Sequence, residues 1–233
     1  MSNLVYIKAI KRPFSDFKKF TIGVILLLVP LLNIITGFIV RGYQLECSKE
    51  AKNKKYKLPE WGNIKKHFIV GILSFIISFV YFLPALIVLI ASFGKVIITL
   101  IQTANPDFES IASALTMAGV IGAVIATILF VLTAYIMPIA LLEFVNKYKF
   151  KDAFRIKKVF KKAFKGKYLG AVLLVVIYYI ILSVITSTLL MAVGLIPYAL
   201  ASQVASVIFS AIVSFAFGVT AFTLIGEVYP KLK

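Results

Sequence analysis

The stretch that decides the fold runs from Phe68 to Ile101 and reads FIVGILSFIISFVYFLPALIVLIASFGKVIITLI. Lys95 is its only charged residue. A helix needs roughly 20 consecutive apolar residues to cross the hydrocarbon core of a bilayer, and this stretch exceeds that length. The stretch therefore predicts a transmembrane helix.

Four further apolar segments accompany it: Thr21 to Val40, Ile111 to Phe144, Tyr168 to Ile196 and Tyr198 to Val228. Hydrophobic residues make up 61% of the chain, charged residues make up 15%, and the mean hydropathy is +0.99. A soluble domain is usually about half apolar. We therefore predict an all-α fold, a polytopic transmembrane helix bundle that forms a single integral membrane domain over residues 1–233.

The basic residues lie between the apolar segments. All but one of the 26 Lys and Arg residues fall in residues 1–20, 41–66, 146–167 and 231–233. The connection that carries Asp107 and Glu109 has none. Because basic loops remain on the inner side of a membrane, we expect both termini to be cytoplasmic in a multi-pass protein of the cell membrane. Segments 68–101, 111–144, 168–196 and 198–228 are then spans, and an outer turn with Gly194 and Pro197 joins the last two.

Segment 21–40 has two interpretations. Basic stretches flank it on both sides, so a single span would place one of them outside. Pro30 divides the segment, and proline interrupts a helix. A re-entrant hairpin that enters and leaves on the cytoplasmic side satisfies both basic stretches, provided that neighbouring helices cover its backbone. The alternative is an ordinary first span with an external N-terminus.

Three basic stretches have the pattern of amphipathic helices that lie in the membrane interface, and the shortest runs from Asn63 to Ile72. In residues 150–167, phenylalanines at 150, 154, 160 and 164 oppose a row of basic residues. Residues 1–20 divide in the same way, with Ile7, Ile10, Phe14 and Phe17 on the apolar side. Anionic lipid headgroups are the expected partner. The candidate lipid-contacting residues are Lys8, Arg12, Lys19, Lys151, Arg155, Lys158, Lys162 and Lys165.

Four charged residues lie inside or at the ends of apolar segments, where an ionised group is costly. We expect Lys95 to extend toward the outer headgroups near Asp107 and Glu109. Glu46, Glu143 and Glu227 end three segments, where the helix dipole opposes a negative charge. Each carboxylate should therefore have a cationic neighbour, and we expect the three to hold the basic helices against the bundle. A proton-coupling role is the alternative.

Small residues recur at every fourth position in two segments: Ala114, Ala118, Gly122 and Ala126 in one, and Ser202, Ser206, Ser210, Ser214 and Gly218 in the other. Such rows are typical of close helix packing or of a dimer contact. The alternative is a polar passage between the serines and the segment from Tyr178 to Ser187.

Catalytic and metal-binding patterns are missing from the sequence. It contains no HExxH, Walker, GxGxxG or GxSxG motif. The single cysteine, Cys47, and the single histidine, His67, leave no metal-ligand set and no partnered nucleophile. We therefore expect a non-enzymatic protein without a cofactor. The third hypothesis is a membrane enzyme, which requires a cluster of polar groups that the linear order does not reveal. The basic residues that give the net charge of +17 lie next to the ends of the apolar segments. This position favours anionic lipid over nucleic acid as the partner.

Several motifs carry a resemblance to a known family: Pro-Phe-Ser-Asp-Phe-Lys-Lys-Phe from Pro13, Val-Pro-Leu-Leu from Val29, Gly-Phe-Ile-Val-Arg-Gly-Tyr from Gly37, and Leu-Pro-Glu-Trp from Leu58. With these motifs the chain resembles the domain-of-unknown-function 4013 family of archaeal integral membrane proteins. It is more distantly similar to membrane domains joined to some glycerophosphodiester phosphodiesterases. The resemblance implies an archaeal source and a membrane location, and no activity.

These observations predict a membrane protein that engages anionic lipid headgroups, or a membrane partner, through a cytoplasmic basic collar. Self-association into a homo-oligomer is compatible with the rows of small residues. The alternative function is that of a small transporter or lipid-handling protein, which requires a polar cavity within the bundle.

Overall fold

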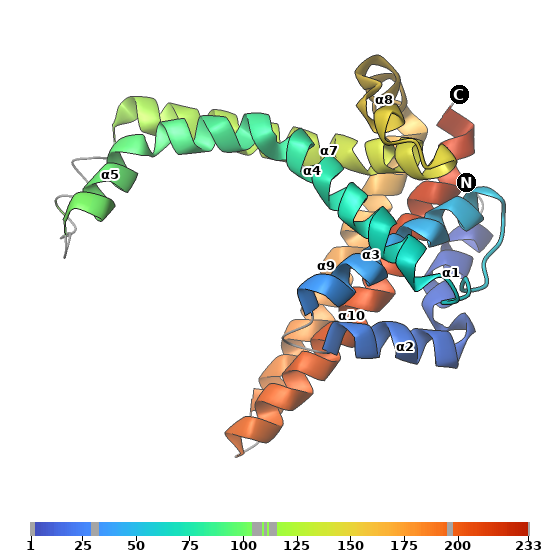
Figure 1. Cartoon of the computed structure of the whole chain (residues 1–233). Coiled ribbons are helices and arrows are strands. Elements are labelled where there is room, and N and C mark those ends of the chain that lie inside the picture. Colours follow the sequence, from blue (N-terminus) through green and yellow to red (C-terminus); the bar gives the residue numbers. More distant parts are fainter. Residues whose placement is uncertain are drawn as a thin grey trace. The chain divides into compact units, whose positions relative to one another are not determined.

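The described part of the chain consists mainly of helices (Figure 1). The computed structural model describes residues 3–28, 33–103, 109, 111, 116–194 and 198–232. Within these residues every regular element is helical, which confirms the all-α fold class. The elements are α1 (Asn3–Lys11), η1 (Arg12–Ser15), α2 (Phe17–Leu28), α3 (Asn33–Lys52), α4 (Ile64–Ser92), α5 (Gly94–Gln102), α7 (Met117–Lys147), η2 (Phe150–Phe154), α8 (Ile156–Ala163), α9 (Gly166–Gly194), α10 (Ala199–Val228) and η3 (Tyr229–Leu232).

Among the described residues, four helices are long and apolar enough to cross a membrane: Ile64–Ser92, Met117–Lys147, Gly166–Gly194 and Leu200–Leu232. In the first three, most side chains of the most apolar part are not buried within the chain. Exposed apolar surface on this scale requires lipid rather than water around it. The chain is accordingly a multi-pass membrane protein.

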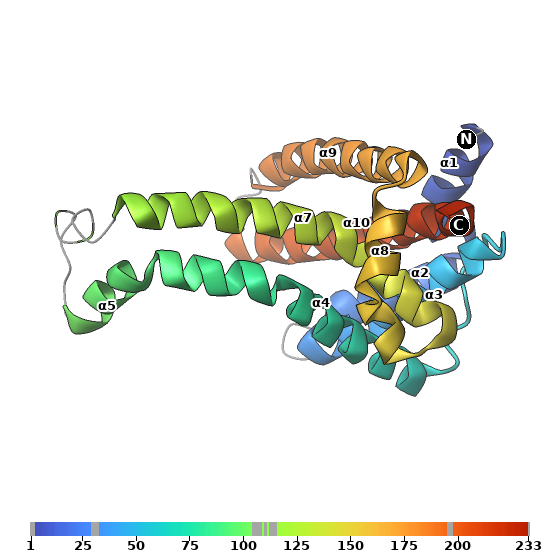
Figure 2. The same cartoon turned by 90° about the horizontal axis from the view of Figure 1, so that it is seen from above.

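The described residues form two compact units. The larger unit comprises Met1–Ile76 with Pro138–Lys233, and the smaller comprises Ile77–Met137. The larger unit is built around α10, which packs against α1, α2, α3 and α9. The paired course of α9 and α10 can be followed in Figures 1 and 2.

Glycines permit very close helix contacts in the larger unit. A Cβ atom added to Gly42 of α3 would lie 1.9 Å from the carbonyl oxygen of His67, and one added to Gly71 of α4 would lie 1.8 Å from that of Phe38. On α10, a Cβ atom at Gly226 would lie 2.2 Å from the carbonyl oxygen of Ser48. The backbone of α3 is therefore in direct contact with the backbones of α4 and of α10, as is common between membrane helices.

The smaller unit contains parts of α4 and α7 that pack on each other, followed from α4 by α5. The rings of Phe82 and Phe130 lie 5.6 Å apart between centroids. Gly122 lies against Ser92, where a Cβ atom would come within 2.1 Å of the serine Oγ. Part of the predicted small-residue row on α7 thus serves helix packing, whereas Ala114 lies outside the described residues.

Several predicted boundaries differ from the structure. The predicted segment 68–101 is divided, because α4 ends at Ser92 and α5 begins at Gly94, a residue that favours helix ends. The predicted single amphipathic helix over 150–167 is also divided. Arg155 has φ −76° and ψ 69°, which is not helical, and it separates η2 from α8. Asp107, Pro30 and Pro197 lie outside the described residues.

Segment 21–40 falls in two helices, α2 and α3, which contact each other and both pack on α10. Neither is among the four helices that could cross a membrane. The 12 residues of α2 extend about 18 Å at 1.5 Å per residue, against roughly 30 Å for a hydrocarbon core. Helix α2 by itself is too short to span.

Candidate functional site

The candidate site is a polar cluster that the larger unit builds where the ends of α3, α7 and α10 meet the basic segments. The most buried carboxylate of this cluster that forms ion pairs is that of Glu143 on α7, whose side chain is 2% exposed. Its Oε2 lies 2.7 Å from Nζ of Lys158, and its Oε1 lies 2.8 Å from Nζ of Lys162. The Lys162 ammonium also lies 3.9 Å from the centroid of the Tyr229 ring. Glu143 therefore joins α8 to α7, next to η3.

Glu46 on α3 has two partners from other segments. Nζ of Lys66 on α4 lies 3.0 Å from its Oε2, and the Tyr148 hydroxyl donates a hydrogen bond to the same oxygen. Burial raises the pKa of Glu46, but the hydrogen bonds from Tyr148 and Lys66 lower it more, so the pKa lies below its ordinary value. Tyr148 has a φ of 52°, a conformation unusual for a bulky residue, and its ring lies against the ammonium groups of Lys49 and Lys66.

Glu227 near the end of α10 accepts hydrogen bonds from two residues. The Tyr56 hydroxyl donates to Oε2 at 2.5 Å, and Nζ of Lys231 donates to Oε1 at 3.2 Å. Burial and the adjacent carboxylate raise the pKa of Tyr56 to about 12, so this phenol remains a donor at neutral pH. Each of the three carboxylates that the sequence singled out thus contacts a donor from a segment outside its own helix.

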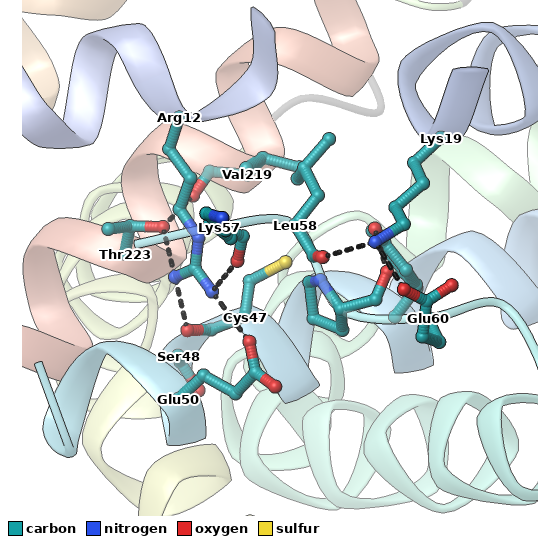
Figure 3. A network of polar contacts seen from close by, with 12 residues as sticks. Arg12, Lys19, Cys47, Ser48, Glu50, Lys57, Leu58, Glu60, Val219 and Thr223 are labelled. Carbon is teal, nitrogen blue, oxygen red and sulfur yellow. Dashed lines mark hydrogen bonds and ion pairs between the residues drawn. The ribbon is translucent and has the colours of Figure 1, made fainter. Parts of the chain in front are cut away.

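Arg12 is at the centre of the network in Figure 3. Its Nη1 donates to the carbonyl oxygen of Cys47 at 2.6 Å and to the Thr223 hydroxyl at 3.1 Å. Its Nη2 donates to Oε2 of Glu50 at 3.0 Å and to the carbonyl oxygen of Lys57 at 3.1 Å. Only 1% of Arg12 is exposed. Arg12 therefore links η1 to α3, α10 and the loop after α3, and we leave it out of the lipid-contacting set.

The Leu-Pro-Glu-Trp motif lies beside this network. Nζ of Lys19 lies 2.5 Å from Oε1 of Glu60 and donates to the carbonyl oxygen of Leu58 at 3.1 Å (Figure 3). In return, Nε1 of Trp61 donates to the carbonyl oxygen of Lys19 at 2.9 Å. The Trp61 ring stacks on Tyr43 with centroids 3.7 Å apart and an interplanar angle of 4°. The motif thus fixes the loop after α3 to α2, and Lys19 is largely used inside the protein.

The other predicted lipid-contacting residues have more accessible side chains. Lys8, Lys151, Arg155 and Lys158 are exposed, although Arg155 also pairs with Asp152 at 3.0 Å. Lys165 is half-buried, and Lys162 is largely enclosed by Glu143 and Tyr229. Large apolar side chains are exposed on the same two basic segments: Ile7, Ile10, Phe14, Phe17, Phe150, Phe160 and Phe164. Exposed lysine and exposed phenylalanine therefore occur together on α8 and on the N-terminal segment.

Lys95 belongs to the smaller unit. It is exposed at the start of α5 and lines a depression of about 410 Å³ with Ser92 and Thr116 among others. No carboxylate of the described residues forms an ion pair with it, and its predicted neighbour Asp107 lies outside them.

A groove of about 390 Å³ lies between α9 and α10. It is lined by Tyr179, Leu182, Ser183, Thr186, Ser187, Ser210, Val213, Ser214 and Phe217. A second depression of about 310 Å³, on the side of α2, shares Ser210 and Ser214 with it. The structure thus has a groove between the two segments, and its lining combines hydroxyl groups with a larger apolar surface.

Sequence reasoning missed the three phenols Tyr56, Tyr148 and Tyr229. Each lies in or next to a basic segment, where tyrosine suggests an interfacial side chain rather than a carboxylate partner. Cys47 and His67 are buried. Among the described residues no three histidine, cysteine or acidic side chains gather as a metal site.

Comparison with known proteins gives the chain a family. No curated protein and no solved structure matches it. The family model described as "Protein of unknown function (DUF4013)" matches residues 24–191, most of the chain. The match includes Glu46, Glu143, α8 and the Leu-Pro-Glu-Trp motif, whereas Arg12 and the whole of α10 lie outside it. The archaeal source implied by the sequence motifs stays a prediction, but the membrane helices and the matched region together establish that the chain belongs to the DUF4013 family.

Proposed function

We propose that this protein is a non-enzymatic membrane protein that binds anionic lipid headgroups through a basic collar on the cytoplasmic side. The collar comprises the exposed basic residues of the N-terminal segment and of residues 150–167, namely Lys8, Lys11, Lys18, Lys151, Arg155, Lys157, Lys158, Lys161 and Lys167. A membrane-protein partner with an acidic surface would use the same residues.

The observation that carries the proposal is the two-sided surface of α8. Phe160 is 38% exposed and Phe164, just after the helix, is 63% exposed, while Lys157 and Lys161 are exposed on the same short element. A helix with this division lies in the plane of the interface, with its rings among the acyl chains and its ammonium groups at the phosphates. The ion pairs of Glu143 with Lys158 and Lys162 join α8 to α7, which supports a fixed position for this helix.

The proposed collar also favours a membrane topology with both termini on the cytoplasmic side. If the basic segments bind the inner leaflet, both termini are cytoplasmic and the α2–α3 pair is a re-entrant hairpin, for which α2 has a suitable length. Cysteine labelling at Ser2 and Asn53, in a chain whose Cys47 is replaced by serine, tests this arrangement. Both positions should react from the same side of sealed vesicles. Reaction from opposite sides would establish an ordinary first span.

Lipid selection by the collar can be measured by native mass spectrometry of the protein from nanodiscs with equal amounts of phosphatidylcholine and phosphatidylglycerol. Each basic residue near an anionic surface contributes about 1 kcal/mol, or about fivefold. Because salt screens exposed charges, the triple variant Lys151→Gln, Lys157→Gln, Lys161→Gln should lose at least about tenfold in phosphatidylglycerol enrichment. The triple variant Lys54→Gln, Lys55→Gln, Lys95→Gln removes equal charge elsewhere and should keep the enrichment. Equal enrichment in both variants would refute the collar.

A second candidate function is that of a small transporter or lipid-handling protein. The groove between α9 and α10 supports it, because a closed bundle without a polar cavity would offer no path or binding site. Transfer of a fluorescent lipid between the leaflets of reconstituted vesicles tests this function. Ser210→Leu should slow the transfer by filling the groove, whereas an unchanged rate would remove this candidate.

A further inference from the structure

Four serine hydroxyl groups in the α9–α10 groove differ from Thr186, which also lines the groove, and from other hydroxyl groups on the same helices. Membrane serines and threonines commonly satisfy their hydroxyls by bonding back to a carbonyl oxygen one turn earlier. Thr186, Thr188 and Ser206 do so, at 2.7, 3.0 and 2.9 Å. Ser183, Ser187, Ser210 and Ser214 make no hydrogen bond to another described residue. The groove therefore presents four serine hydroxyls with free hydrogen-bonding capacity.

Two aromatic residues, Tyr179 and Phe217, line part of the groove. The Phe217 ring lies 5.3 Å from that of Tyr179 in an edge-on arrangement, and 6.2 Å from that of Tyr178 in a stacked arrangement. Leu182 and Val213 supply apolar walls between the hydroxyl groups. A volume of about 390 Å³ with apolar walls and a few polar groups is typical of sites for small molecules.

The depth of the groove limits the charge of a ligand. Ser183 is 16 residues beyond Lys167 along α9, and Ser214 is 13 residues before Glu227 along α10, which correspond to about 24 and 20 Å of helix. Both distances place the groove within the hydrocarbon core, well away from the basic collar. None of the lining residues is charged. A charged headgroup at this depth would lack a counterion and would be costly to place there.

We infer that the groove binds an uncharged lipid whose hydroxyl or carbonyl oxygens exchange hydrogen bonds with these serines. The hydrocarbon part of the lipid packs against Phe217, Leu182 and Val213. A serine hydroxyl both donates and accepts, so it suits either an alcohol or an ester carbonyl. This inference rests on the lipid-handling function proposed above and names its ligand class.

The test uses a photoactivatable diacylglycerol as the uncharged probe and a photoactivatable phosphatidylglycerol with the same acyl chains as the charged one. The full-length protein is reconstituted in phosphatidylcholine vesicles and illuminated with either probe, and the labelled peptides are located by mass spectrometry. Diacylglycerol should label peptides that contain Tyr179 or Phe217, and phosphatidylglycerol should label them at least tenfold less.

Variants separate the groove from the rest of the protein. Ser187→Ala and Ser214→Ala should each reduce groove labelling about fivefold, as expected for one net hydrogen bond. Ser210→Leu should abolish it, with the melting temperature measured to establish folding. Thr188→Ala is the matched control, because this α9 hydroxyl is already bonded to the carbonyl oxygen of Val184 and does not line the groove. It should label normally.

Several results would overturn the inference. They are equal labelling by the two probes, labelling that Ser187→Ala and Ser214→Ala leave unchanged, and crosslinks between two protein copies at the groove in place of lipid adducts. Leaflet transfer of diacylglycerol is measured separately. Groove labelling without transfer would preserve the binding site while removing the transport function, so failure of one is distinguishable from failure of the other.

Discussion

Replacing Glu143 with glutamine should release α8 from the bundle. The change keeps the size of the side chain but removes the negative charge that faces Lys158 and Lys162 at 2.7 and 2.8 Å. The two lysines differ in their access to water. Lys158 has 44% of its side chain exposed and can turn toward solvent, whereas Lys162 has 13% exposed and remains beside the Tyr229 ring.

The expected magnitude follows from this difference. Removing one partner of a fully buried ion pair costs about 3–5 kcal/mol, whereas an exposed pair contributes about 0–1 kcal/mol. Glu143 is buried and one of its lysines is nearly so, but glutamine can still accept one hydrogen bond. We therefore expect a loss of about 2 kcal/mol in the free energy of opening α8, which increases amide exchange about 30-fold.

Hydrogen exchange of the protein in nanodiscs, followed by mass spectrometry of the peptide spanning Ile156–Ala163, measures this effect. Glu60→Gln is the control, because the Glu60 side chain is 82% exposed and its pair with Lys19 should contribute less than about 1 kcal/mol. Lys162→Gln should increase exchange in α8 more than Lys158→Gln does. Exchange of α8 within twofold of the unaltered protein in Glu143→Gln would refute the view that this carboxylate holds the helix.

Four further predictions address the rest of the larger unit. Arg12→Lys should lower the unfolding free energy by about 2–3 kcal/mol in thermal denaturation, because one ammonium cannot reach the four acceptors of the guanidinium; a melting temperature equal to that of the unaltered protein would contradict this. Gly71→Ala should lower the free energy of unfolding by about 1–3 kcal/mol, because its Cβ atom would lie 1.8 Å from the Phe38 carbonyl oxygen. Gly170 has open space around it, so the control Gly170→Ala should leave the free energy of unfolding unchanged or raise it. Cys47 is buried, and burial raises the pKa of its thiol to about 12. N-ethylmaleimide at pH 8 should therefore label Cys47 only after denaturation. Rapid labelling of the folded protein would show that the α3 contacts are wrong. The folded-state pKa of Glu46 lies below its ordinary value of 4.5, so its stabilising contribution is complete at neutral pH and is lost as the pH falls below 4.5. Glu46→Gln should therefore flatten the acidic part of the plot of melting temperature against pH. A plot identical to that of the unaltered protein would argue against the contact with Lys66 and Tyr148.

The membrane fold could be predicted from the sequence because lipid imposes a simple rule on composition. An apolar run of more than about 20 residues with hardly any charge is typical of a membrane-spanning helix. Four such segments were therefore enough to predict the four long helices. Helix ends were less predictable. The break between α4 and α5 falls inside a continuous apolar run, where hydropathy does not change but Gly94 alters the backbone preference.

The candidate site was harder to predict, because it depends on which side chains meet. The sequence shows that Glu46, Glu143 and Glu227 need donors, since an acid at a helix C-terminus is opposed by the dipole. It does not show that Tyr148 and Tyr56 supply two of these donors, because they are 102 and 171 residues away along the chain. Arg12 resembles the lysines around it in the amphipathic pattern. Only the fold reveals that four acceptors surround it.

The charge balance of the larger unit connects its packing with the proposed function. Each acidic residue of that unit takes part in an ion pair: Asp16, Glu46, Glu50, Glu60, Glu143, Asp152 and Glu227. The fold thus uses these carboxylates internally, while the whole chain carries a net charge of +17. The surplus cations must be balanced by ions or anionic groups from outside the protein. Mobile counterions can do so in solution, whereas the proposed function assigns this role to lipid phosphates at the membrane surface. The affinity for phosphatidylglycerol should therefore fall steeply with added salt, whereas labelling of the uncharged α9–α10 groove should not.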